Sequence, residues 1–309
     1  MLHGILQRSG TNLLNEILLM SPSVAQPVLK VRENWFLHYS DSLYEYSDEL
    51  FQKWTNPKWG GDDYSKSEFY NFIGEALVNY IGQKIPDLPN KSLLSKTPSV
   101  QRLERNLQLF PSSKIIIITR DPRDIAASAL KTWGRPIQKS IKDWNLAAKA
   151  ISDFEKQASP DSYLLLRYED LLSNQKKWVT KCLQFLELDT TNFPWSDLIN
   201  MPVFGSSDNE GKWEVKPATA SFQPLSRRQS LSKDEASHFT SINASSMDYF
   251  GYTTRDEDSP CLPTRTNRLA KEITLTSDCL QPNKSTLSFS DRATKFKTGL
   301  KLMRQAVIG

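Results

Sequence analysis

The sequence predicts an α/β fold, a P-loop-like doubly wound parallel sheet flanked by helices, with a C-terminal extension. Three observations predict it. Continuous apolar runs at residues 2–6, 114–119 and 163–167 are typical of strands covered on both faces. Amphipathic helical patterns alternate with these runs, as in doubly wound sheets. A glycine-containing loop at residues 7–12 joins the first run to a helical pattern at 13–20.

The loop at residues 7–12 predicts an anion cradle, because backbone N–H groups at a helix N-terminus carry the positive end of the helix dipole. It is not a nucleotide-binding P-loop of the G-x-x-x-x-G-K-[ST] type. Thr11 follows Gly10 directly, and the cation, Arg8, precedes the glycine. The loop alone is equally compatible with a plain strand-to-helix turn.

The next elements are an aromatic stretch and a capped helix. Residues 35–59 are rich in Trp, Tyr and Phe, and they line an acceptor pocket or pack on the core. Ser65 and Glu68 form a capping box. The apolar residues that follow are expected to share one face of this helix: Phe69, Phe72, Ile73, Ala76, Leu77, Tyr80 and Ile81. Residues 27–31 and 92–95 are weaker strand candidates.

The strand at 114–119 leads into a second motif, Arg-Asp-Pro-Arg-Asp at 120–124. Pro122 suits the first turn of a helix, so Arg120 is expected at a carboxyl strand end, where doubly wound sheets bind ligands. Ser128 lies almost two turns along that helix. An Arg fork with a hydroxyl can clamp a phosphate. A further amphipathic helix after Pro136 is predicted to bury its apolar face: Ile141, Trp144, Ala148, Ile151 and Phe154.

Composition limits the classes of function. The chain has 309 residues, 39% of them hydrophobic, and a net charge of +4, which fits a globular protein better than a nucleic-acid-binding one. Its three cysteines and three histidines show neither disulfide nor metal-site spacing. Neither a signal peptide nor a membrane span is visible. The expectation is a cytoplasmic, metal-free enzyme whose anionic partner is small.

Two domains are expected, a globular one at 1–252 and an extension at 253–309. The extension is rich in Ser, Thr, Pro, Asn and Asp, which predicts an extended arm. It ends in a basic amphipathic helix at about 290–307. Docking on its own domain or on a second subunit, and thus a homodimer, is favoured over membrane binding because the apolar stripe is short.

Taken together, the motifs resemble the sulfotransferases that use 3′-phosphoadenosine 5′-phosphosulfate (PAPS). The resemblance rests on Gln-Arg-Ser-Gly-Thr at 7–11, Lys-Thr-Pro at 96–98, the motif from Arg120 to Ser128, and Arg-Tyr-Glu-Asp-Leu at 167–171. It covers about residues 2–252. It implies a donor site whose members are Arg8, Ser9, Gly10, Thr11 and Asn12 for the phosphosulfate, Arg120 and Ser128 for the 3′-phosphate, Tyr168 near the adenine, and Arg228 in a late basic segment.

The chemistry that this resemblance implies is in-line sulfuryl transfer to a small-molecule acceptor, without a metal ion. Arg8 would neutralise charge on the leaving group. Glu33 ranks above His38 and Lys96 as the general base. The acceptor cannot be read from the sequence, which allows a hydroxyl, an amine or a guanidine. A P-loop kinase or NTPase and a non-catalytic nucleotide-binding relative remain the alternatives.

Overall fold

The computed structural model describes residues 1–27, 33–55, 64–198, 201, 203–207, 213–216 and 224–252. Its centre is a parallel sheet in the order β4-β1-β5-β6. These strands are β4 (Lys96–Thr97), β1 (Leu2–Gly4), β5 (Ile115–Thr119) and β6 (Tyr163–Arg167). Two small pairs accompany it: parallel β2 (Val24–Ala25) with β3 (Ser92–Leu93), and antiparallel β7 (Val203–Ser207) with β8 (Trp213–Lys216).

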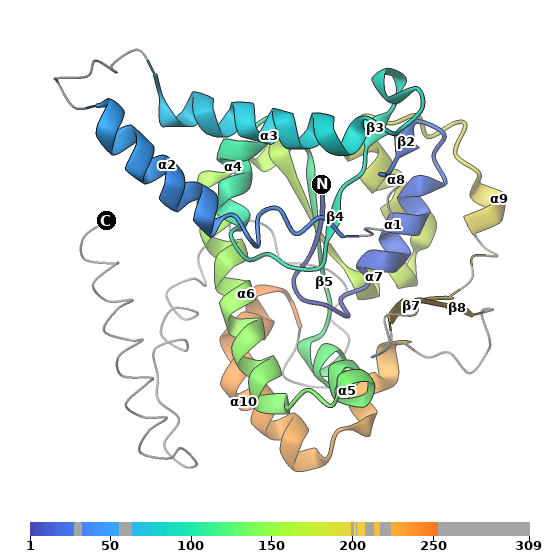
Figure 1. The fold of residues 1–309 in the computed structure, drawn as a ribbon. Helices are drawn as coiled ribbons and strands as arrows, with labels where there is room; N and C mark the ends of the chain where they lie inside the picture. Colours follow the sequence, from blue (N-terminus) through green and yellow to red (C-terminus); the bar gives the residue numbers. More distant parts are fainter. Residues whose placement is uncertain are drawn as a thin grey trace.

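Helices cover both faces of the sheet, as Figure 1 shows. Strand β5 explains why its apolar run is continuous. Ile115 and Ile117 pack into a cluster with residues of α6 (Ile137–Gln157) and α10 (Lys233–Tyr249). Ile116 and Ile118 face the opposite cluster, built with α1 (Thr11–Leu19) and α8 (Gln175–Phe185). Because successive side chains point to opposite faces, a central strand needs apolar residues throughout. The doubly wound α/β fold is confirmed.

The other helices complete the two layers and the rim. The α-helices are α2 (Asp41–Trp54), α3 (Lys66–Gly82), α4 (Asn106–Leu109), α5 (Pro122–Trp133), α7 (Tyr168–Ser173) and α9 (Trp195–Leu198). The 3₁₀ segments are η1 (Leu88–Asn90), η2 (Leu103–Arg105), η3 (Pro160–Ser162) and η4 (Pro224–Ser230). Within the described ranges, no helix combines the length and apolarity needed to cross a bilayer.

Local signals in the sequence place several helix ends correctly. Ser65 and Glu68 form the expected capping box, and Pro122 is the first residue of α5. The predicted core face of α6 is buried along its length. Gly134 ends α5 in a left-handed conformation, φ 61°.

Three expectations need correction. The first strand is shorter than predicted, and the segment 92–95 lies outside the main sheet, where β4 takes its place. The apolar face of α3 is split: its inner side packs on α4 and α2, whereas Phe72, Ala76 and Tyr80 are exposed. A helix needs only one apolar stripe to pack on the body, so the second stripe is left in solvent. The candidate strand at 27–31 lies almost wholly outside the described residues, as does the extension at 253–309 with its helix.

Candidate active site

The loop between β1 and α1 has a backbone that few sequences can adopt. Gly10 has φ 100°, and a Cβ atom there would lie 2.3 Å from the Tyr168 ring. Arg8 also has a positive φ, 74°. The turn therefore requires glycine at position 10 and holds the start of α1 against Tyr168. The Ser9 hydroxyl is fully buried and has no hydrogen-bond partner among the described residues.

The second motif meets this loop directly. The Arg8 Nε atom donates a hydrogen bond to Ser128 Oγ over 2.9 Å. The Arg120 Nη1 atom donates to the Arg8 carbonyl oxygen over 2.9 Å, and the Arg120 guanidinium lies 4.8 Å from the centre of the Tyr168 ring. Loop and motif thus converge at the carboxyl ends of β1 and β5, the edge where such sheets bind ligands.

The late basic segment η4 brings two arginines with different contacts. The backbone N–H of Arg228 donates to Asp124 Oδ1, and its Nη1 atom donates to Asp121 Oδ2, each over 2.7 Å. Arg227 instead lies near enough to Arg8 and Arg120 to act on the pKa of Arg8. Consecutive side chains of a 3₁₀ helix point about 120° apart, so only one of the two can face the loop. The sequence prediction selected Arg228 from this pair.

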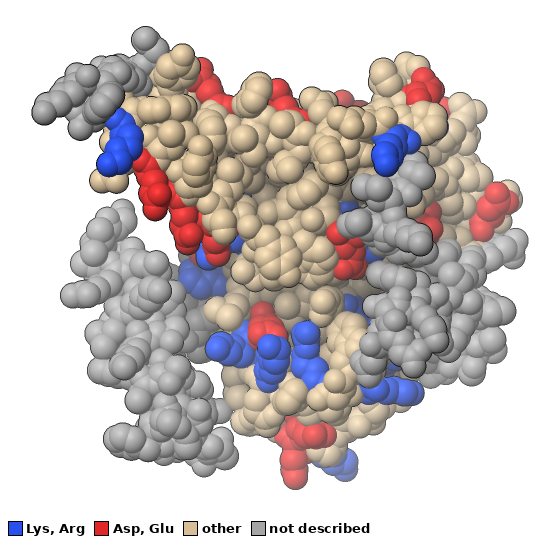
Figure 2. Space-filling view, viewed as in Figure 1, with Lys and Arg blue, Asp and Glu red and all other residues tan. Residues whose placement is uncertain are grey.

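Positive charge is concentrated at this edge. Burial lowers the pKa of Arg8 to about 10, and the cations Arg227 and Arg120 add to the effect, although the guanidinium stays protonated at neutral pH. Burial also raises the pKa of Asp124 to about 6, against the influence of Arg120. Figure 2 shows Lys and Arg side chains gathered over the lower part of the molecule, around α5 and α6. Such a field attracts anions.

Glu33 reaches the same edge through Lys96. The Lys96 ammonium group is buried, lies 3.5 Å from Glu33 Oε1 and donates to Asn12 Oδ1 over 2.5 Å. Asn34 fixes the neighbouring backbone, since its N–H donates to the Lys96 carbonyl and its Oδ1 accepts from Thr97 Oγ1. One ammonium group therefore lies between the predicted base and the predicted donor loop.

His38 lies apart from Glu33 and Lys96. Its ring packs edge-on against Trp35 and Tyr39, and its Nδ1 atom is 3.4 Å from Ser99 Oγ. Burial lowers the pKa of His38. These side chains line a groove of about 1090 Å³ that runs along α6 and reaches Gln7, beside the loop. Arg135 Nη2 donates to Gln7 Oε1 over 3.1 Å at that end.

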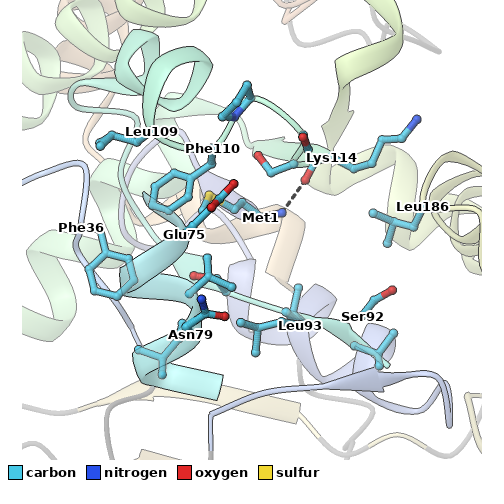
Figure 3. Close-up of a pocket in the computed structure, with 18 of the residues that line it drawn as sticks. Met1, Phe36, Glu75, Asn79, Ser92, Leu93, Leu109, Phe110, Lys114 and Leu186 are labelled. Carbon is cyan, nitrogen blue, oxygen red and sulfur yellow. Dashed lines mark hydrogen bonds between the residues drawn. The ribbon is translucent and has the colours of Figure 1, made fainter. Parts of the chain in front are cut away.

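A second cavity, of about 640 Å³, lies at the opposite edge of the sheet. Met1 and Lys114, which precede β1 and β5, both line it, so it opens at the amino ends of the strands. Figure 3 shows Phe36, Phe110 and Leu93 around this cavity, with Glu75 and Asn79 from α3. It is separated from the edge that carries the loop at 7–12 and Arg120 by the length of the sheet.

The sequence reasoning thus named most of the side chains that converge here. The loop at 7–12, Arg120, Ser128 and Tyr168 come together, and Glu33 joins them through Lys96. Arg227, which lies near Arg8 and Arg120, was not among the predicted residues, although the pair of arginines is visible in the sequence. Among the described residues, no group of three His, Cys, Asp or Glu side chains has the arrangement of a metal site.

Comparison with known proteins points to one family. A model of the sulfotransferase family matches residues 5–192, more than half of the chain. A protein-tyrosine sulfotransferase of Drosophila melanogaster is 24% identical over 211 residues, which are 63% of this chain but only 38% of that protein.

Solved structures of similar shape include a sulfotransferase from Alicyclobacillus acidocaldarius, with 15% identity and a TM-score of 0.49 over 80% of this chain and 92% of that one. The sulfotransferase domain from the curacin biosynthetic pathway has 17% identity and a TM-score of 0.45, and the match covers 88% of this chain and 96% of that domain.

Proposed function

This chain belongs to the sulfotransferase family, and we propose that it transfers the sulfuryl group of PAPS to a hydroxyl, amine or guanidine of a small-molecule acceptor such as a secondary metabolite. The protein is accordingly a transferase. The reaction is an in-line displacement that releases 3′-phosphoadenosine 5′-phosphate. Its cytoplasmic location stays a prediction from the sequence.

The contact between Arg8 and Ser128 carries the proposal. PAPS bears anionic groups at two ends of one nucleotide, so its site needs two anion-binding elements at a fixed separation. The Arg8–Ser128 hydrogen bond and the bond from Arg120 to the Arg8 carbonyl join the first loop to the second motif. An isolated phosphate cradle would not need that coupling.

The first loop has the groups that a phosphosulfate requires. Arg8 is a buried cation at the start of the loop, and the Ser9 hydroxyl is a buried donor that the described residues leave unsatisfied. A buried hydroxyl without a partner costs free energy, which a phosphate oxygen would offset. Arg8 then stabilises the negative charge that develops on the leaving nucleotide.

We assign the late basic contact to Arg227 rather than Arg228. Asp121 and Asp124 hold Arg228 by its side chain and its backbone, which turns the preceding residue toward Arg8 and Arg120. Arg228 would then position η4, and Arg227 would touch the nucleotide.

Glu33 remains the preferred general base, with Lys96 as its partner. The base must be ionised and close to the sulfuryl group. The buried ammonium group of Lys96 lies between Glu33 and Asn12 and holds the Glu33 side chain beside the donor loop. His38, which lies along the groove with Trp35 and Tyr39, is better placed to contact the acceptor.

Binding of nucleotide without metal tests the donor. We expect 3′-phosphoadenosine 5′-phosphate to raise the Tm in the presence of a chelator, and magnesium-ATP to leave it unchanged. The opposite pattern would favour a kinase or NTPase. Transfer of labelled sulfate from PAPS to a metabolite extract then tests turnover, with a tyrosine-containing peptide as a second arm because of the Drosophila relative. Nucleotide binding without transfer to any acceptor would indicate a non-catalytic relative.

A further inference from the structure

Helix α3 carries an apolar stripe that the rest of the described chain leaves uncovered. Phe72 and Tyr80 are 70% and 69% exposed, and Ala76 between them is exposed as well. Spaced at i, i+4 and i+8, they form one line along the helix surface. Figure 1 shows α3 across the top of the molecule, and Figure 2 shows mainly uncharged surface there.

The opposite side of α3 is firmly attached to the body. A Cβ atom on Gly74 would lie 1.6 Å from the Leu109 carbonyl oxygen, so helix and α4 approach without room for a side chain. Residues two positions apart on a helix point about 200° away from each other. Phe72 and Ala76 flank Gly74 at that spacing, so they must face outward, and no rotation of α3 can bury them.

The stripe is complementary to a second copy of itself. In an antiparallel pair related by a two-fold axis at Ala76, residues equally far from Ala76 on either side meet. Phe72 then meets Tyr80 of the second copy, and the small Ala76 lets the helices approach. Four aromatic side chains of about 150–250 Å² each, of which roughly 70% is still exposed, would supply about a third to just over half of the roughly 1,200 Å² at the lower bound of stable interfaces.

The charges at the two ends of the stripe agree with this arrangement. Glu68 and Lys84 are both exposed, each eight residues from Ala76 on opposite sides. Gln83 keeps a helical conformation, φ −53° and ψ −29°, so Lys84 continues the line of the stripe. The two-fold axis brings Glu68 of each copy to Lys84 of the other. The alternative occupant, a basic segment such as the one at 290–307, would find an opposite charge only at the Glu68 end of the stripe.

We propose that the exposed stripe of α3 is an isologous homodimer interface with antiparallel helices centred on Ala76. The interface does not depend on the donor site. It lies near the cavity at the amino ends of the strands, which α3 lines, whereas the loop and Arg120 lie at the carboxyl ends. Both donor sites of the dimer stay open, so variants of the stripe should keep nucleotide binding.

Sedimentation velocity of the full chain over a range of concentrations tests the interface. The wild type is expected to be a reversible dimer, and Phe72→Ser a monomer that binds nucleotide normally. Tyr46→Ser is the matched control, since Tyr46 is a 59% exposed aromatic on α2, away from the stripe. A monomeric wild type would overturn the proposal. So would a dimer that survives Phe72→Ser, because another surface, such as the segment 253–309, would then hold it.

A charge exchange tests the antiparallel register. Lys84→Glu and Glu68→Lys should each raise the dimer Kd at least about tenfold, because like charges meet at both ends. Mixed in equal amounts, the two variants should form a heterodimer with nearly the wild-type Kd, since each end again pairs opposite charges. Circular dichroism checks that Glu68→Lys, which breaks the capping box, keeps its helix content. If the mixture stays as weak as the separate variants, the register is wrong.

Discussion

Arg8 and Ser128 are 120 positions apart in the chain, yet a 2.9 Å hydrogen bond joins Nε of one to Oγ of the other. The loop after β1 and the helix after β5 thereby share one contact at the edge of the sheet. Neither segment identifies its ligand alone. Their junction brings a cation and a hydroxyl together, and the proposed role in holding the nucleotide rests on this contact.

Replacing Arg8 is expected to affect catalysis more than binding. Arg8→Ala should lower kcat roughly 10²–10³-fold, the loss seen when one donor to a developing charge is removed. Arg8→Lys should recover part of this, because it keeps the charge but loses the Nε contact. Steady-state kinetics and nucleotide Kd by calorimetry check both, with the exposed Lys131→Ala as the control. Equal kcat in Arg8→Ala and wild type would remove Arg8 from the mechanism.

Substitution of the two arginines of η4 should affect different properties, nucleotide affinity for Arg227 and stability for Arg228. Arg227→Ala is expected to raise the nucleotide Kd about tenfold, with a Tm within a degree or so of wild type, because it removes one charge-assisted contact. Arg228→Ala leaves the buried Asp121 without one of its partners and should cost about 2 kcal/mol of stability. Calorimetry and thermal melts on both variants measure this. The reverse pattern would return the nucleotide contact to Arg228.

Gly10 and Gly134 form a matched pair. Both have positive φ, 100° and 61°, but a Cβ atom meets the Tyr168 ring at position 10 and nothing within 4 Å at position 134. Gly134→Ala should therefore cost only about 1 kcal/mol, the penalty of a left-handed conformation. Gly10→Ala should cost more and should also weaken nucleotide binding by moving the loop. Similar melting curves and affinities for the two variants would contradict the tight packing.

Glu33→Gln is expected to abolish most of the turnover while leaving nucleotide affinity and Tm unchanged, because the variant lacks the proposed base, which is not among the groups proposed to hold the donor. His38→Asn should mainly raise KM for the acceptor. Rates over a range of pH distinguish the two: loss of the acidic limb in Glu33→Gln identifies the base. Wild-type rates in Glu33→Gln would make His38 the stronger candidate.

Glu169 makes stability depend on pH. Burial raises its pKa from 4.5 to about 7. Between these two pH values the folded protein keeps a proton on Glu169 that the unfolded chain has released. The stabilising contribution is present below pH 4.5 and is lost as the pH rises to about 7. Glu169→Gln, which resembles the protonated form, should remove this part of the pH dependence. Urea unfolding at several pH values measures the free energy of unfolding of wild type and variant. If this free energy changes with pH in the same way for both proteins, the raised pKa of Glu169 is contradicted.

Sequence patterns located residues that follow directly from one strand end, while their roles in the site stay predictions. The strand at 114–119 and Pro122 located Arg120 and Ser128, and Gly10 located the loop. The sequence could not decide between Arg227 and Arg228, because the contacts that hold Arg228 come from Asp121 and Asp124, more than 100 positions away. The residues of α3 that were expected on one face are divided between a packed and an exposed side, because periodicity does not show which part of an apolar surface finds a partner.

The sequence by itself determined the alternation of three apolar strands with helices, the capping box of α3, the start of α5 and the family, because these depend on local periodicity, capping chemistry and motifs. Tertiary structure alone decided that Lys96 lies between Glu33 and Asn12, that Arg8 contacts Ser128, and which side of α3 is left exposed. Such contacts arise when distant segments meet at one edge of a sheet. Pairing of this kind is set by packing of the whole chain, which no local pattern encodes.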